Sequence, residues 1–289
     1  MRYYYITDSK VDENEFVIKN GVLKEYEGNK KEIVIPNGVE EIGDSVFDGY
    51  RSLQSVTIPG SVKKIGEDAF YSCGSLQSII IPNGVEEIGD FAFAYCDSLQ
   101  SITIPSNVKK MGEYTFYNCD SLQSVIISNG VKEIGHGAFA YCYDLQSVTI
   151  PNSVEKIGDE AFMDCDSLKS ITIPNGVEKI GDAAFAFCDS LQSVIIPSGV
   201  KEIEYSAFKQ CASLRSVTIL NGVEKIGAGI FAFCDSLQSV TISGSVKEIG
   251  EYAFKGCDSL KSIYINDEKT AYVILENNPR VKDKIVMFR

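Results

Sequence analysis

The chain has 289 residues, a formal net charge of −13 and 44% hydrophobic residues, which is the composition of a globular protein. The negative charge repels phosphate groups, so we expect no binding to nucleic acid or to an anionic membrane surface. No apolar run is long enough to span a bilayer, so we also expect no membrane insertion.

The first residues, MRYYYITDSKVDENEF, lack the apolar segment and the small-residue cleavage site of a secretory signal peptide. A chain that begins natively at this point is expected in the cytoplasm. If the N-terminus was trimmed, a secreted or cell-surface location is the alternative. Residues 1–9 are compatible with a further strand or with a disordered segment.

Residues 16–24 have the pattern of a β-hairpin, in which two strand-like runs flank Asn20-Gly21. The hairpin leads to Ile-Val-Ile-Pro at residues 33–36, a half-unit of the repeat that follows, with Lys30 at the leucine position. An open stack of repeats must cover its first apolar edge. We therefore predict that residues 1–32 form an N-terminal extension and hairpin cap.

A phenylalanine recurs every 23 residues through ten units with no insertion or deletion. A leucine stands six residues after each phenylalanine, and a cysteine stands three residues after it in nine units, with Tyr50 in the first. A strict period of this length is typical of a solenoid, whose units bury their apolar sides only against their neighbours. The phenylalanines are Phe47, Phe70, Phe93, Phe116, Phe139, Phe162, Phe185, Phe208, Phe231 and Phe254.

Each unit reads approximately as GVxxIGxxAFxxCxSLQSVTIPx. Residues 53–58 have the L-x-x-L-x-L spacing of a leucine-rich repeat strand, with Val56 and Ile58 facing inward. Pro59 ends this strand because it has no backbone N–H to donate. The return path passes to the opposite side, where residues 69–73 are expected to form a short helix or helical turn.

The pattern IGxxAFxxCxSLxSVxIP resembles the BspA-type (Treponema-type) leucine-rich repeats, and it covers residues 33–265 as a half-unit plus ten units. The resemblance implies an α/β repeat solenoid. This would be a right-handed β-α superhelix with a parallel sheet on one face, in a single elongated domain. It also implies adhesion or protein–protein recognition, often on microbial surfaces.

Residues 266–289 are predicted to form the C-terminal cap. Within them, residues 268–277 have the pattern of a helix that stops before Pro279. Residues 284–288 then read as a short final strand.

A second period lies within the first, because the residues after the phenylalanine differ between alternate units. In every other unit the phenylalanine is followed by alanine and then by an aromatic residue, as in Ala94-Tyr95. In the intervening units the larger side chain comes first, directly after the phenylalanine, as in Tyr117-Asn118. We favour a packing explanation, in which a large side chain in one unit covers a small one in the next. An aromatic stripe that binds a partner on the convex side is the alternative. The alternate aromatic residues are Tyr95, Tyr141, Phe187 and Phe233.

Charged pairs alternate in sign in the first units, with Glu40-Glu41 followed by Lys63-Lys64, and Glu86-Glu87 by Lys109-Lys110. Stacking about 4.8 Å apart places unlike charges side by side. We interpret this pattern as a device that disfavours a slip of one unit.

The sequence has no motif of a catalytic or dinucleotide-binding site, so we expect no enzyme, no catalytic residue and no cofactor. The one histidine, His136, reads as an exposed loop residue. The nine cysteines lack the spacing of zinc sites, and we expect them buried as small apolar residues. The aspartates that follow them are expected to hydrogen-bond the turn backbone, with Ca²⁺ binding as the alternative. We therefore predict no metal site. These aspartates are Asp97, Asp120, Asp166, Asp189, Asp235 and Asp258.

The outward strand positions are the candidate binding surface, since ten strands extend about 48 Å, enough for a standard protein interface. Most of these positions repeat Gln, Ser and Thr, and the departures from them are our candidate partner-binding residues. Neutral drift on a solvated sheet is the alternative explanation of the departures. The candidates are Ile80, Ile126, Ile195, Tyr264, Lys169, Arg215 and Lys261.

The function that these residues indicate is a non-catalytic protein–protein interaction scaffold or adhesin-like module that uses the outward face of the sheet. The partner would be an unidentified protein, such as one on a host or cell surface, and the chain itself would be a monomer. A carbohydrate-binding surface protein is the alternative, but glycan platforms are usually aromatic, and only Tyr264 supplies an aromatic ring on this face.

Overall fold

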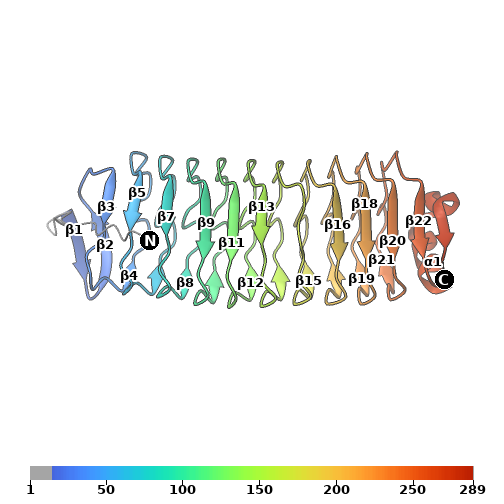
Figure 1. Cartoon of the computed structure of the whole chain (residues 1–289), viewed down its shortest axis with the longest axis horizontal. Helices are drawn as coiled ribbons and strands as arrows, with labels where there is room; N and C mark the ends of the chain where they lie inside the picture. The colour runs from blue at the N-terminus through green and yellow to red at the C-terminus, as the bar shows by residue number, and fades with distance from the viewer. Residues whose placement is uncertain (1–14, 289) are drawn as a thin grey trace, which may run out of the picture.

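The computed structural model describes residues 15–288 as one elongated stack of coils (Figure 1). The predicted strand or disordered segment at residues 1–9 lies outside this range. Figure 1 shows the N-terminal hairpin at one end of the stack and α1 (Glu268–Asn277) at the other. The chain is therefore a repeat solenoid, as the 23-residue period predicts.

The strands form two rows of parallel neighbours, one on each side of the coils. The first row holds the SVTI segments and the second row the shorter KI or EI segments. The strands of the first row are β3 (Glu32–Val34), β5 (Ser55–Thr57), β7 (Ser78–Ile80), β9 (Ser101–Ile104), β11 (Ser124–Ile127), β13 (Ser147–Thr149), β16 (Ser193–Ile196), β18 (Ser216–Ile219), β20 (Ser239–Ile242), β22 (Ser262–Ile265) and β23 (Ile285–Met287). The strands of the second row are β2 (Val22–Tyr26), β4 (Glu41–Ile42), β6 (Lys64–Ile65), β8 (Glu87–Ile88), β10 (Lys110–Met111), β12 (Glu133–Ile134), β14 (Lys156–Ile157), β15 (Lys179–Ile180), β17 (Glu202–Ile203), β19 (Lys225–Ile226) and β21 (Glu248–Ile249).

Neighbouring units pair in register, so that each residue lies beside its equivalent one unit away. Ser124, for example, pairs with Ser101 on one side and Ser147 on the other. The strand pairing is interrupted in each row, between β7 and β9 and after β13 in the first row, and between β10 and β12 in the second. An isolated bridge between Ser170 and Ser193 extends the first row by one unit before β16, on the C-terminal side of this second interruption.

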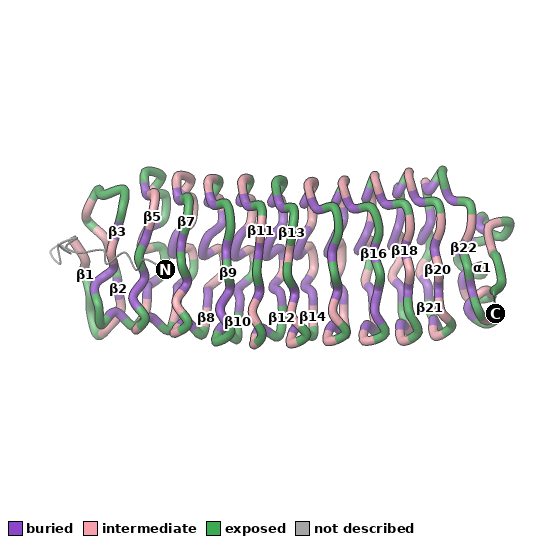
Figure 2. The backbone as a smooth tube through the Cα atoms, viewed as in Figure 1, coloured by how far each residue is buried: buried purple, intermediate pink, exposed green. Residues whose placement is uncertain are grey.

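The core fills the space between the two rows with columns of identical residues. The repeated phenylalanine rings stack on one another, with centroids 5.2 Å apart between Phe70 and Phe93 and 6.0 Å apart between Phe208 and Phe231. Leucine, isoleucine and valine columns are buried beside them along the whole stack (Figure 2). This confirms that units are stabilised by burial against their neighbours.

The return segment is not helical, so the expected helix or helical turn at residues 69–73 and its equivalents is wrong. Alternate N–H groups instead bond to the next unit: Phe70 N donates to Ala92 O (2.8 Å) and Ser72 N to Ala94 O (2.9 Å). Tight turns join these bonds, as Cys73 N donates back to Phe70 O. An α-helix would satisfy its N–H groups within the segment, whereas these hydrogen bonds tie the units together. The superhelix therefore lacks its α component, and its right-handed sense stays a prediction.

The two ends carry the predicted elements. β1 (Phe16–Lys19) pairs with β2 in an antiparallel hairpin, and both Asn20 and Gly21 have positive φ, as a type I′ turn requires. At the other end α1 has the predicted bounds, followed by a 3₁₀-helix, η2 (Pro279–Lys284), and by β23, which pairs with β22. The only α-helix within residues 15–288 has ten residues, so no helix in this range can cross a membrane.

Candidate functional site

The candidate surface is the outward side of the first row, which we call the sheet face. It consists of the side chains equivalent to Gln54, Ser55 and Thr57 in the ten units. The residues between and beyond them, Val56 and Ile58, are buried, which leaves these three positions to face solvent. The alternation of buried and exposed residues follows from the period-2 geometry of a strand.

The three isoleucines of the sheet face are well exposed. Ile80 is 81% exposed, Ile195 is 60% exposed and Ile126 is 50% exposed. Each lies beside threonine, and Ile126 pairs with Thr103 and Thr149. The structure therefore spaces the isoleucines along the face and does not gather them into one patch.

The three basic residues of the sheet face, Lys169, Arg215 and Lys261, are exposed in the C-terminal half of the stack. None of them has a carboxylate within ion-pair distance in residues 15–288. Lys261 Nζ lies 3.5 Å from Gln238 Oε1 of the preceding unit. These cations are thus available to a partner.

Tyr264 does not stand alone, because the C-terminal cap extends the sheet face beyond it. Tyr264 pairs with Val286 of β23, and both side chains are more than a third exposed. Met287 and Phe288 are also exposed. The sequence analysis missed these three residues, although the apolar Ile-Val-Met-Phe run after a charged segment was the available signal.

The cysteines are buried, as predicted, and the structure adds a role for their thiols. Each Sγ donates a hydrogen bond to the carbonyl of a phenylalanine 26 residues earlier, such as Cys96 Sγ to Phe70 O at 3.3 Å. Burial raises the pKa of Cys96, and it raises that of Cys73 to about 12. The thiols of Cys73 and Cys96 are therefore protonated structural groups. Within residues 15–288 no cluster of three or more His, Cys, Asp or Glu side chains could hold a metal ion.

The prediction for the aspartates that follow the cysteines is wrong. None of these carboxylates accepts a backbone hydrogen bond within residues 15–288, and the turn is bonded through main-chain groups, as when Ser190 N donates to Asp166 O (3.1 Å). A different column has the predicted role. Four aspartates that directly follow the bend glycine each accept, through a carboxylate oxygen, the backbone N–H of the residue 23 positions later, in the next unit. They are Asp44, Asp90, Asp159 and Asp182.

His136 is half-buried and does not occupy a freely exposed loop position. Its Nε2 shares a hydrogen bond with the Tyr114 hydroxyl, and its Nδ1 lies 4.0 Å from Asp159 Oδ2. It lines a groove of about 450 Å³ beside the interruption between β10 and β12. Nothing in this groove positions a nucleophile or an oxyanion donor. Tyr114, His136 and Asp159 therefore form a polar cluster that packs at this interruption.

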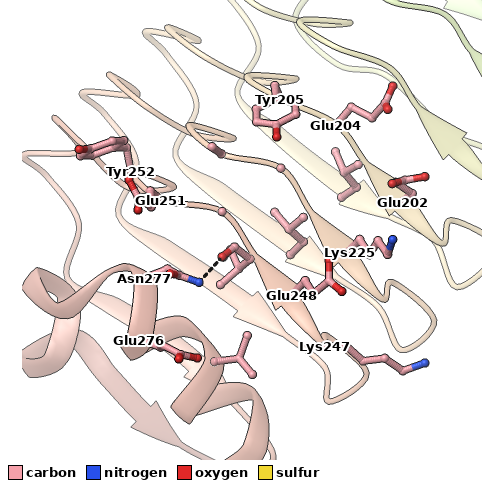
Figure 3. A pocket seen from close by; sticks show the side chains of 17 residues that line it. Glu202, Glu204, Tyr205, Lys225, Lys247, Glu248, Glu251, Tyr252, Glu276 and Asn277 are labelled. Atoms are coloured by element: carbon pink, nitrogen blue, oxygen red, sulfur yellow. Dashed lines mark hydrogen bonds between the residues drawn. The ribbon is translucent and has the colours of Figure 1, made fainter.

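A second groove, of about 620 Å³, lies between the last second-row strands and α1 (Figure 3). Glutamates dominate its charged lining, and Figure 3 shows Asn277 bonded to the backbone beneath it, where its Nδ2 donates to Ile249 O at 2.9 Å. None of the candidate residues of the sheet face lines this groove. It belongs to the joint between the repeats and the cap.

The alternate aromatic residues pack against one another, which supports the packing explanation of the 46-residue period. Tyr71, Tyr95, Tyr117 and Tyr141 form a continuous edge-to-face series with centroids 5.3–5.5 Å apart. The small residues of the same units, such as Ala94, are fully buried. Further along, the Lys209 and Lys255 amines take the place of tyrosine over Phe187 and Phe233.

The predicted alternation of charge is present in the second row. Lys64 pairs with Glu41 (3.4 Å) and Lys110 with Glu87 (3.7 Å). Two steps break the rule, because Lys132 stands 23 residues after Lys109 and Lys156 lies in register with Lys179. The Lys179 amine turns instead to Glu204 (2.7 Å), which occupies a position that is glycine in the other units.

Several solved structures are similar to this one. A leucine-rich cell surface protein of Faecalibacterium prausnitzii A2-165 is 27% identical, with a TM-score of 0.54, over 89% of this chain and 94% of that one. Leucine-rich repeat proteins of Bacteroides ovatus and Eubacterium ventriosum are each 22% identical, with TM-scores of 0.51 and 0.53. The first covers 99% of this chain and 100% of its own, and the second 84% and 77%. These two show the fold alone. No curated protein matches the chain.

The family model for the BspA type leucine-rich repeat region, in six copies, matches residues 18–146 and 132–261. These ranges contain the second hairpin strand, β2, and all the repeat strands before β22, and they agree with the 23-residue spacing of the Phe, Leu and Cys columns. Proteins built from such repeats are in general binding scaffolds without catalytic activity. The chain belongs to the BspA-type leucine-rich repeat family.

Proposed function

We propose that the chain is a non-catalytic protein-binding module, adhesin-like in character, whose sheet face contacts the partner. The observation that carries this proposal is the exposure of Ile80, Ile126 and Ile195 on a regular surface of paired strands. Apolar side chains that a fold does not bury lower the free energy of a complex that covers them. The serines and threonines around them can supply the polar rim.

The domain organisation supports this use of the surface. The hairpin of β1 and β2 and the C-terminal cap would close the two apolar ends, leaving the repeats of residues 33–265 to present the sheet face. Similarity to a cell surface protein of F. prausnitzii favours the secreted or cell-surface location over the cytoplasmic one. The partner is then a protein met outside the cell.

The test uses the full chain immobilised on beads and a set of extracellular and cell-surface proteins. The triple variant Ile80→Asp, Ile126→Asp, Ile195→Asp should lose the proteins that the unchanged chain captures. A control with Tyr205→Asp, Tyr252→Asp and Tyr272→Asp carries the same added charge at exposed positions on other surfaces and should retain them. Equal capture by both variants would remove the sheet face from the function, and a defined ligand on a glycan array would favour the carbohydrate alternative.

A further inference from the structure

The C-terminal half of the sheet face carries all of its basic residues at a regular spacing. Lys169, Arg215 and Lys261 occupy the same position in every second unit, with glutamine in the units between. Because neighbouring parallel strands lie about 4.8 Å apart, successive cations are about 10 Å apart along the stack. The three together span about 19 Å.

No acidic residue offsets these cations on the sheet face. The positions equivalent to Gln54, Ser55 and Thr57 contain no Asp or Glu in any of the ten units, although the chain has a net charge of −13. The carboxylates lie in the turns and in the second row, where several glutamates form ion pairs with lysines. Interactions beyond about 8 Å are largely screened at physiological ionic strength, so the carboxylates of the second row, across the core, offset these cations only weakly.

Apolar side chains accompany the cations. Ile195 lies in the unit between Lys169 and Arg215, and Tyr264 follows Lys261 on the same strand. Beyond Tyr264 the strand β23 adds Val286 (39% exposed), next to the exposed Met287 and Phe288. Aromatic residues and arginine are the side chains that most often dominate the binding energy of protein interfaces.

We propose that this half of the sheet face binds an extended acidic segment of a partner protein that runs along the stack, across the strands. A segment in the extended polyproline II conformation has three residues per turn and rises about 3.1 Å per residue, so carboxylates at every third position lie on one side, about 9 Å apart, close to the spacing of the cations. An apolar side chain at the end of the segment covers Tyr264 and Val286. This inference rests on the proposed function for the class of partner and adds the chemistry that the partner must present.

An extended protein segment fits this surface better than a polyanionic glycan does. A sulfated glycan would engage the three cations but would leave Ile195, Tyr264 and Val286 exposed to water. A segment with an acidic residue at every third position and an apolar residue at one end matches both features. The glycan is therefore an outcome of the test that contradicts the proposal.

The experiment measures the binding of the full chain to two pools of labelled twelve-residue peptides by fluorescence anisotropy. One pool has glutamate fixed at every third position and an apolar residue at one end, and the other has glutamine in place of glutamate. The glutamate pool should bind at least tenfold more tightly, and the difference should shrink in 0.5 M NaCl because the contacts are exposed ion pairs.

The decisive variant is Lys169→Gln, Arg215→Gln, Lys261→Gln, which installs the glutamine that the other units already have and so keeps the fold. It should lose most of the preference for glutamate. The matched control, Lys63→Gln, Lys109→Gln, Lys247→Gln, makes the same change of net charge on the second row and should bind like the unchanged chain. A second variant, Val286→Asp, should weaken binding with the cations intact.

Three results would overturn the proposal: no preference for the glutamate pool, equal losses in both triple variants, or binding of heparin that Val286→Asp does not alter while the peptides fail to bind. The isoleucine variants of the capture experiment separate this failure from that of the proposed function. If capture still depends on Ile80, Ile126 and Ile195, the protein-binding role stands and only the acidic partner is wrong.

Discussion

Left-handed backbone recurs at two positions of every unit, two residues before and two residues after the phenylalanine. Bulky residues occupy many of these positions, including Tyr95 (φ 59°) and Phe187 (φ 61°). A non-glycine residue in this region costs about 1–2 kcal/mol. The N–H of Tyr95 donates to Tyr117 O (2.8 Å), so hydrogen bonds to the next unit accompany the strained conformation.

Ala183 and Ala184 give a test of this strain because they are adjacent and differ in conformation. Ala183 has φ 50°, whereas Ala184 is fully buried and has no positive φ. Ala183→Gly should raise the free energy of unfolding by about 0.5–1 kcal/mol, since glycine adopts positive φ without a steric cost. Ala184→Gly should lower it by about 1–2 kcal/mol. Urea unfolding of both variants checks the opposite signs, and two losses of equal size would contradict the strain.

Asp164 predicts a pH dependence. Burial, together with Asp166 and Asp189, raises the pKa of its carboxyl to about 6. Because the pKa is raised, folding takes up a proton at this site, and the stabilisation is complete below pH ~4 and is lost as the pH rises through about 6. Above pH 6 the ionised carboxylate therefore destabilises the folded chain.

The variant Asp164→Asn should be more stable than the unchanged chain at pH 7.5, by up to about 1 kcal/mol after allowance for solvent screening, and equally stable near pH 4. Asparagine tolerates the positive φ of this position (56°), so the backbone is unaffected. Thermal unfolding at the two pH values checks the difference. Asp258→Asn, at an exposed position of the unit that ends the stack, is the control, and an equal gain at both pH values would exclude the titration of Asp164.

At the scale of elements, several contacts fix the C-terminal cap to the last unit, and Asn278 supplies two of them. Asn278 Oδ1 accepts the N–H of buried Ala253 (2.8 Å), and its Nδ2 donates to Gly250 O (3.1 Å). In inner units the equivalent alanine N–H bonds to the glycine carbonyl of its own unit, as Ala184 N does to Gly181 O (3.4 Å), so in the last unit Asn278 bridges these two groups. The helix α1 therefore acts as a terminal unit with a polar outer surface, as an open solenoid requires.

Asn278→Ala should lower the free energy of unfolding by about 1–3 kcal/mol because it leaves a buried N–H without an acceptor. Hydrogen exchange should accelerate first at Ala253 and its neighbours in the last unit. Glu276→Ala, on the exposed side of α1, is the control and should change neither quantity. Uniform acceleration along the whole stack would show that the cap does not act locally.

At the scale of the whole molecule, two patterns require that units follow one another in order. The edge-to-face tyrosine series repeats every 46 residues, and the charges of the second row alternate over the first units. Deletion of one unit breaks both patterns, whereas deletion of two consecutive units preserves the aromatic pattern. The repeating unit of stability is therefore two coils.

Deletion of one unit, residues 72–94, would join Tyr71 to Tyr95 and place Lys63 and Lys64 beside Lys109 and Lys110. Deletion of two units, residues 72–117, would keep the tyrosine alternation and oppose Lys64 with Glu133. We expect the two-unit deletion to have a higher melting temperature than the one-unit deletion, although the shorter solenoid has fewer stabilising interfaces between units. Calorimetry of both variants checks this order, and a lower value for the shorter chain would contradict the two-coil unit.

The sequence by itself determined the repeat, its columns, the strands of the first row, and the hairpin and helix at the two ends. The 23-residue spacing permits no other register, and the hairpin and α1 carry local turn and capping signals such as Asn20-Gly21 and Asp267, whose side chain accepts the Thr270 N–H. The exposure of Ile80 likewise follows from strand alternation, whereas Lys169 lies just before the alternating positions of its unit.

Only the tertiary structure decided how the return segment satisfies its hydrogen bonds. Spacing such as Ala69, Phe70 and Cys73 suits a helical turn, and no local rule predicts positive φ at tyrosine or phenylalanine. Those conformations form because a neighbouring unit offers a carbonyl at each step, as Ala92 does for Phe70. The same dependence on neighbours placed Val286 beside Tyr264, since strand pairing between the cap and the last unit brings together residues that are far apart in the sequence.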